Sequence, residues 1–206
     1  MTSITPPADF EPGSRERVLR NRLGVRSPRE IARHENEALA IATERLVHQT
    51  PRELRFAAPD LCRIHLFWLG DIYHCAGQYR TVDGSRHGFT VPAAREVPRL
   101  MQEFTRGSLV EYTPCRFTDG EDLAWALGVV YADFLRIHPF RDGNARCARL
   151  LATLMGAQAG LPRLDFSVLG GRGKVRHTAA IHAGIAQNYK PMVEVFRRVL
   201  GKTLGA

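Results

Sequence analysis

The sequence has few of the features that mark metal-binding, membrane-spanning or secreted proteins. Its four cysteines stand well apart, at Cys62, Cys75, Cys115 and Cys147. They lack the paired spacing of a zinc site, so we expect reduced thiols and no structural metal centre. No apolar run approaches the roughly 18 residues of a membrane span, and the first residues lack the basic-then-apolar order of a secretory signal. These absences predict a cytoplasmic protein that does not contact a membrane.

Length and composition are those of one globular domain. Of the 206 residues, 44% are hydrophobic and 24% are charged, which are ordinary values. Residues 1–13 carry three prolines and few large apolar side chains, so we expect an extended or disordered lead-in there. We expect residues 14–206 to form a single domain.

The net charge of +8 raises the hypothesis of a basic helical module that binds nucleic acid. Basic residues crowd two stretches, residues 15–29 and 172–177. Solvated helix faces explain such runs more often than not, and a basic surface also attracts nucleotides. We therefore do not expect nucleic-acid binding, and charge alone assigns no function.

The apolar pattern predicts an all-α fold. Helical composition extends over residues 27–48, 58–70, 93–107, 118–137, 145–160 and 176–200. Capping boxes are predicted at Ser27 and Thr118, and residues 58–70 are typical of a buried helix. Residues 118–137 contain the apolar stripe of a core helix, formed by Leu123, Leu127, Val130, Phe134 and Ile137. β-prone segments on both sides of the turn DGSRHG, within residues 79–92, predict one small hairpin.

The stretch HPFRDGNARCAR, residues 138–149, places many different polar groups between two expected helices. Pro139 and Gly143 favour a turn, with Asn144 at the start of the second helix. Backbone N–H groups at a helix start suit a phosphate. Arg146 and Arg149 are three residues apart, so they share a face of that helix and offer planar guanidinium groups to phosphate oxygens.

Three other side chains of this stretch suggest further roles. Asp142 is a hard oxygen ligand that could hold Mg²⁺ between phosphates. His138 has a reference pKa near neutrality and could take a proton from a hydroxyl. Phe140 is suited to an apolar plug that fixes the turn on the core. Each polar residue alone could be a helix cap or a solvated charge, but their occurrence together on one turn favours phosphate chemistry.

This stretch resembles the signature of the Fic family, His-Pro-Phe-x-Asp/Glu-Gly-Asn-x-Arg-x-x-Arg, and every specified position is present. Other segments similar to Fic domains extend the resemblance over roughly residues 12–163. The resemblance implies an all-helical bundle with a short β-hairpin flap. It also implies a protein adenylyltransferase, which transfers AMP from ATP to a Ser, Thr or Tyr hydroxyl of a target protein, as a toxin or a regulatory modifier.

The resemblance implies a role for each matching position. His138 would be the catalytic base, and Asp142 would bind Mg²⁺. The residues that would bind the ATP phosphates are Gly143, Asn144, Ala145, Arg146 and Arg149, with the two arginines on the outer phosphates. The flap would dock the target backbone as an added strand. Its docking residues would be Arg80, Thr81, Val82, Phe89, Thr90 and Val91.

The chain departs from the family at Ala145, where glycine is commonest. Alanine is harmless there if the residue is right-handed helical, but it costs about 1–2 kcal/mol if the position needs a positive φ. Many Fic proteins inhibit themselves through Ser/Thr-x-x-x-Glu followed by Gly or Asn. No Ser or Thr here has Glu four positions later.

The missing inhibitory pattern favours a separate small antitoxin that supplies an inhibitory helix. Phosphate or UMP transfer on the same scaffold remains an alternative, although the Doc toxins, which phosphorylate, depart from the Gly-Asn-x-Arg-x-x-Arg pattern kept here. A basic helical module that binds nucleic acid and carries an inactive motif is a further alternative. A homo-oligomer and delivery into a host or target cell also stay open.

Overall fold

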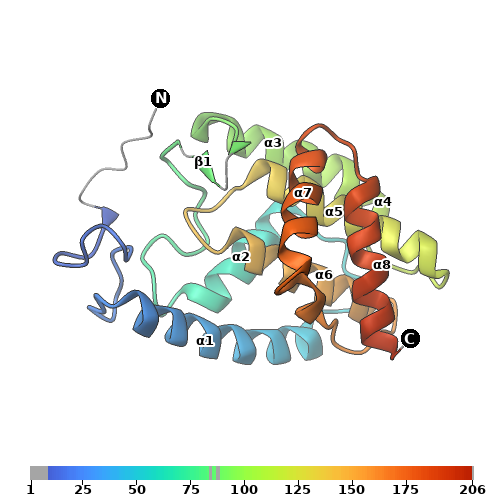
Figure 1. Ribbon diagram of the computed structural model, residues 1–206, viewed down its shortest axis with the longest axis horizontal. Helices are drawn as coiled ribbons and strands as arrows, with labels where there is room; N and C mark the ends of the chain where they lie inside the picture. Colours follow the sequence, from blue (N-terminus) through green and yellow to red (C-terminus); the bar gives the residue numbers. More distant parts are fainter. Residues whose placement is uncertain (1–8, 84, 87–88, 206) are drawn as a thin grey trace.

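The computed structural model describes residues 9–83, 85–86 and 89–205, so residues 1–8 of the expected lead-in lie outside it. The fold is built from helices joined by loops, which confirms the all-α prediction (Figure 1). The first half contains α1 (Pro28–Gln49), α2 (Ala58–Leu69), η2 (Ala94–Glu96), α3 (Val97–Phe104), the π-helical turn η3 (Thr105–Leu109) and α4 (Val110–Tyr112). The second half contains α5 (Gly120–Ile137), α6 (Asn144–Gln158), η4 (Phe166–Leu169), α7 (Gly173–Ile185) and α8 (Lys190–Leu204).

Helix α5 is the central element of the fold. It packs against α6, α7 and α8, while α7 and α8 lie side by side (Figure 1). The predicted apolar stripe of α5 is buried at every position, from Leu123 to Ile137. A helix that is apolar on nearly all sides lies inside a bundle. The motif turn at the C-terminal end of α5 is therefore attached to the most buried helix of the protein.

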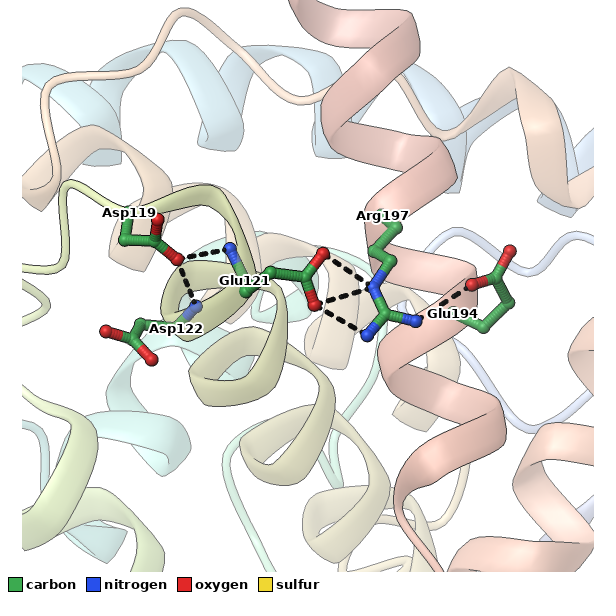
Figure 2. Close-up of polar contacts among 5 residues, drawn as sticks. All are labelled: Asp119, Glu121, Asp122, Glu194 and Arg197. Carbon is green, nitrogen blue, oxygen red and sulfur yellow. Dashed lines mark hydrogen bonds and ion pairs between the residues drawn. The ribbon is translucent and has the colours of Figure 1, made fainter.

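The start of α5 differs from the prediction by one residue. The N-cap is Asp119, not Thr118: its Oδ1 accepts the backbone N–H groups of Glu121 at 2.8 Å and Asp122 at 3.2 Å (Figure 2). A carboxylate can accept both N–H groups at once and also favours the positive end of the helix dipole. The other predicted cap is present, since Ser27 Oγ accepts the N–H of Glu30 at 3.4 Å.

An exposed ion-pair cluster joins α8 to the first turn of α5. Arg197 donates from Nη2 to Glu121 Oε2 at 2.6 Å and from Nη1 to Glu194 Oε2 at 3.0 Å (Figure 2). These hydrogen bonds raise the pKa of Arg197, and the neighbouring arginine lowers the pKa of Glu194. Exposed ion pairs stabilise proteins little, so we expect this cluster to contribute little to the stability of the fold.

The expectation that residues 58–70 form a buried helix is only half right. Leu66 and Phe67 are 53% and 45% exposed. The buried face is formed instead by Leu61, Ile64, His65, Trp68 and Leu69. These residues recur at the three- and four-residue spacing of one helix face, whereas Leu66 and Phe67 fall on the opposite side. Two polar-edged rings, His65 and Trp68, therefore point inward toward the motif.

The predicted hairpin is present beside the motif turn. Strands β1 (Ser85–Arg86) and β2 (Phe89–Thr90) are antiparallel, with Ser85 opposite Thr90 and Arg86 opposite Phe89. The chain leading into the hairpin contacts the motif directly, because the Arg80 N–H donates to the carbonyl of Pro139 at 2.9 Å. None of the helices in the described part of the chain has both the length and the hydropathy needed to cross a membrane.

Candidate active site

The motif turn begins where His138 ends α5. His138 has the left-handed backbone conformation, with φ of 52° and ψ of 59°, and its N–H donates to the carbonyl of Phe134 at 3.0 Å. Pro139 has no N–H group with which to continue the helix. The half-buried His138 side chain therefore stands at a sharp corner between α5 and α6.

Phe140 and Asn144 close the turn. The Phe140 N–H donates to Asn144 Oδ1 at 2.9 Å, and Asn144 Nδ2 donates to the Phe140 carbonyl at 2.8 Å. Both residues are buried. The Asn144 carboxamide, which the resemblance assigns to the α-phosphate, thus has one Nδ2 hydrogen left for a ligand. Its clear role in the structure is to fix the shape of the turn.

His65 of α2 contacts the turn through Phe140 and Asp142, and the sequence motif does not reveal these contacts. Its ring stacks on Phe140, with 3.9 Å between the ring centroids. Its Nδ1 accepts the N–H of Gly77 at 2.9 Å, so Nε2 carries the hydrogen and donates to the Asp142 carbonyl at 3.2 Å. Burial lowers the pKa of His65 to about 4, and the imidazole is therefore neutral at physiological pH.

Gly143 and Ala145 have opposite requirements. Gly143 has a φ of 76°, and a Cβ there would lie 2.9 Å from the Trp68 ring. Only glycine meets both conditions without strain. Ala145 is exposed and lies within the right-handed helix α6. The departure from glycine at this position therefore introduces no backbone strain.

The first turn of α6 presents backbone N–H groups that no side chain of the N-cap satisfies. The first N–H groups of any α-helix lack partners within the helix, and the helix dipole favours an anion there. Asp142, 42% exposed, precedes this end of the helix. One exposed carboxylate beside a phosphate site fits Mg²⁺, which usually takes one or two carboxylates together with phosphate oxygens and water. The described residues contain no cluster of three His, Cys, Asp or Glu that could hold a metal without such help.

The two motif arginines have different surroundings. Arg146 Nη1 donates to Glu35 Oε2 at 2.7 Å, and its guanidinium lies 4.8 Å from the centroid of the Trp68 ring. Arg149 Nε donates to the carbonyl of Ala145 at 3.3 Å. Among the described residues, no carboxylate forms an ion pair with Arg149. Arg146 is thus held by protein groups, whereas Arg149 keeps most of its donors for a ligand.

Two cavities meet at Arg149. One, of about 290 Å³, is lined by His138, Ala145 and Arg149 together with Lys174, His177 and Thr178 of α7. The other, of about 550 Å³, lies between α1 and α6, and its lining includes Arg146, Arg149 and Arg163. The candidate base, the first turn of α6 and the second motif arginine therefore border the smaller cavity, and Arg149 also lines the larger one. The α7 residues carry no local motif that would have announced them.

Of the predicted flap residues, Arg80 supports the hairpin, whereas Phe89 and Thr90 form one of its strands. Arg80 is buried, and it donates to the carbonyls of His138 at 2.8 Å, Val82 at 3.2 Å and Pro92 at 2.6 Å. It therefore holds the two ends of the hairpin together and joins them to the motif turn. Thr81 is exposed and Val91 is buried. Phe89 and Thr90 form strand β2, the edge that the resemblance assigns to target docking.

Comparisons with known proteins agree with this geometry. The family model described as the Fic/DOC family matches residues 55–155. The probable protein adenylyltransferase Fic of Salmonella typhimurium is 31% identical over 150 residues, which cover 69% of this chain and 70% of that protein. The protein adenylyltransferase VbhT of Bartonella schoenbuchensis is 26% identical over 162 residues; the match covers 77% of this chain but only 32% of VbhT.

A solved structure shares the fold. The crystal structure of the BepC protein, a VirB-translocated effector of Bartonella tribocorum with bound AMPPNP, superimposes with a TM-score of 0.71 at 22% identity. The superposition covers 88% of this chain and 91% of BepC. Together with the complete signature on its turn, these matches identify the family: the chain belongs to the Fic/DOC family.

Proposed function

We propose that this chain transfers AMP from ATP to a Ser, Thr or Tyr hydroxyl of a target protein. Its relatives in the family are named protein adenylyltransferase or probable protein adenylyltransferase, which supports an enzyme of the nucleotidyltransferase class. The observation that carries the proposal is the common cavity of His138 and Arg149 at the start of α6. A base, an anion-binding helix end and a cation thus border one space.

The proposed reaction is an in-line displacement at the α-phosphorus. The target hydroxyl oxygen forms a bond to phosphorus, while the bond from phosphorus to the oxygen that bridges to the β-phosphate breaks. Pyrophosphate leaves, and the hydroxyl proton moves to the imidazole of His138. Catalysis of this kind depends on positioning and on stabilising negative charge, more than on covalent participation of the protein.

Each side of the site has one task in this proposal. The N–H groups of the first α6 turn bind the α-phosphate, and Arg146 and Arg149 bind the outer phosphates. The nucleoside occupies the cavity lined by Lys174 and His177, which suits the AMPPNP bound by the related BepC. Asp142 would hold Mg²⁺, which neutralises phosphate charge when bound. The open edge of β2 pairs with the target backbone and brings its hydroxyl to His138.

A regulatory or toxic role is part of the proposal, because Arg149 has no carboxylate partner among the described residues. An arginine in that state can bind a phosphate without prior release. We therefore propose control by a separate antitoxin that brings its own carboxylate, and not by this chain alone.

Isotope-labelled ATP tests the proposed reaction. The protein is incubated with a cell lysate and either α-labelled or γ-labelled ATP, with His138→Asn as the control. We expect label from the α-phosphate to appear on protein, and no label from the γ-phosphate. Protein that carries only γ-label would indicate phosphorylation instead, and stronger labelling from α-labelled UTP would indicate UMP transfer.

A further inference from the structure

A buried glutamate on α1 contacts the first motif arginine from far away in the sequence. Glu35 lies 111 positions before Arg146, yet its Oε2 accepts Nη1 of Arg146 at 2.7 Å. The Glu35 side chain is 7% exposed and that of Arg146 is 20% exposed. Glu35 is outside the signature, and nothing in the pattern HPFRDGNARCAR anticipates its contact.

Glu35 is fixed by two aromatic residues besides Arg146. The Tyr73 hydroxyl donates to Glu35 Oε1 at 2.7 Å, and Trp68 Nε1 donates to the Glu35 backbone carbonyl at 2.9 Å. Burial, followed by the bond to Glu35, raises the pKa of Tyr73, so its hydroxyl keeps its proton and remains a donor. Both carboxylate oxygens are thus bonded, and the carboxylate has one defined position.

Arg146 is held in one orientation by this arrangement. Its guanidinium lies over the Trp68 ring at 4.8 Å, while Nη2 is 3.9 Å from Asp142 Oδ2. A guanidinium has five N–H donors, and the bond to Glu35 fixes one end of the group without using the rest. The side chain also lines the larger cavity together with Arg149. Its remaining donors can therefore bind phosphate oxygens without further ordering of the side chain.

We propose that Glu35 is a positioning residue, which fixes the guanidinium of Arg146 for the β- and γ-phosphates of a nucleoside triphosphate. The inference rests on the proposed function in placing a nucleotide at this site. A carboxylate that blocked the phosphate would have to withdraw on binding. Withdrawal would break a buried ion pair and leave the Glu35 carboxylate buried with the Tyr73 hydroxyl but without the cationic charge of Arg146, which is strongly unfavourable. Glu35 therefore keeps its contact when the nucleotide is bound.

The number of phosphates on the ligand gives a test that a purely structural role would fail. Calorimetric titrations with AMP, ADP and ATP, in Mg²⁺ buffer, are compared between the wild type and Glu35→Gln. We expect affinity for ADP and ATP to fall about tenfold, as for the loss of one hydrogen bond to a charged group. Affinity for AMP, which lacks the outer phosphates, should change less than about twofold. An equal loss for all three nucleotides would overturn the proposal, and so would a gain for ATP.

A double-mutant cycle ties the effect to Arg146. In the Arg146→Gln background, Glu35→Gln should cause no further loss of ATP affinity, because residues that act through one contact are not additive. Full additivity would contradict the inference. Glu35→Asp, which keeps the charge but withdraws it by one methylene, gives a second measurement if Glu35→Gln does not fold, and the same ADP and ATP pattern is expected.

The outcome for this inference is separable from that for the proposed function. Nucleotide binding is measured without any target protein or transfer step. If the wild type transfers no AMP but the affinity pattern and the cycle hold, then the proposed reaction fails and Glu35 still positions Arg146.

Discussion

Arg80 Nε donates to the backbone carbonyl of His138 at 2.8 Å. This hydrogen bond joins the start of the hairpin segment to the candidate catalytic base. The same guanidinium holds the carbonyls of Val82 and Pro92 on the two sides of the hairpin. In the proposed reaction, Arg80 would therefore support both the target strand on β2 and the imidazole at the end of α5. We expect this buried side chain to set the distance between the docked hydroxyl and His138.

Replacing Arg80 by lysine should therefore uncouple docking from chemistry. A lysine ammonium cannot reach three carbonyls in the planar arrangement of a guanidinium. We expect Arg80→Lys to lower AMP transfer about tenfold or more, with ATP affinity changed less than about threefold. Arg99→Lys, the same change at an exposed arginine of α3, is the control and should leave both quantities unchanged. Equal losses of AMP transfer and ATP affinity would mean that Arg80 supports the nucleotide site instead.

His138 should be needed for transfer and not for nucleotide binding. Its backbone has a φ of 52°, so His138→Asn is a better variant than alanine, because asparagine tolerates the left-handed conformation. We expect transfer to fall by at least about a hundredfold, the usual contribution of a general base. Affinity for ATP should stay within about threefold of the wild type. Undiminished transfer by His138→Asn would remove His138 from the mechanism.

Gly143 and Ala145 form a matched pair of tests within the signature. Gly143→Ala places a Cβ at positive φ and 2.9 Å from the Trp68 ring, and should lower the free energy of unfolding by about 2 kcal/mol. It should also weaken ATP binding by distorting the start of α6. Ala145→Gly should cost only about 0.5–1 kcal/mol and leave ATP binding intact. Urea unfolding and nucleotide titration measure both quantities, and equal effects of the two variants would contradict the assignment.

The neutral His65 beneath the motif turn should make stability depend on pH. Its pKa is about 4 in the folded protein and 6.5 in the unfolded chain, so the unfolded chain binds more protons between these values. This difference in pKa contributes roughly 3 kcal/mol to the free energy of unfolding. The contribution is complete above pH 6.5 and is lost as the pH falls toward 4. Urea unfolding from pH 8 to pH 4 should show this loss in the wild type. The His65→Gln variant, which does not titrate, should show a flatter profile, and parallel profiles would refute the assignment.

Arg149 gives a prediction about control. Because no described carboxylate pairs with it, the isolated protein should be active without any activating mutation. We expect no single Glu→Gly variant of this chain to raise AMP transfer, and we expect growth inhibition when the chain is expressed without an antitoxin. A large gain of transfer from any one glutamate variant would show that the inhibitory carboxylate lies within this chain.

The sequence predicted those parts of the site that are local in the chain. Residues 138–149 are contiguous, so their spacing can be read directly from the sequence. Pro139 and Gly143 also indicate where α5 ends and where α6 begins. The network around Glu35 could not be found in that way, because its members come from α1, α2 and α6. One signal was available: Glu35 stands on the buried side of α1, at helical spacing from Ile31 and Ala42. A charged residue on such a face calls for a buried partner, but nothing in the pattern says which one.

The hairpin shows the same limit. Its existence followed from the turn residues, but the role of Arg80 did not, because an arginine beside a turn is usually solvated. Only the folded chain brings the three carbonyls around one guanidinium.

The positions that the signature leaves unspecified differ in burial, so they should differ in the substitutions that they tolerate. Four of its positions are written x, yet Cys147 and Ala148 are buried in the core, whereas Ala145 is exposed and Arg141 is half-buried at the edge. A library randomised at these four codons should return polar and charged residues at 145, and only small apolar residues at 147 and 148. The positions written x thus fall into two classes: exposed positions that tolerate many residues, and buried positions that accept only side chains of small volume.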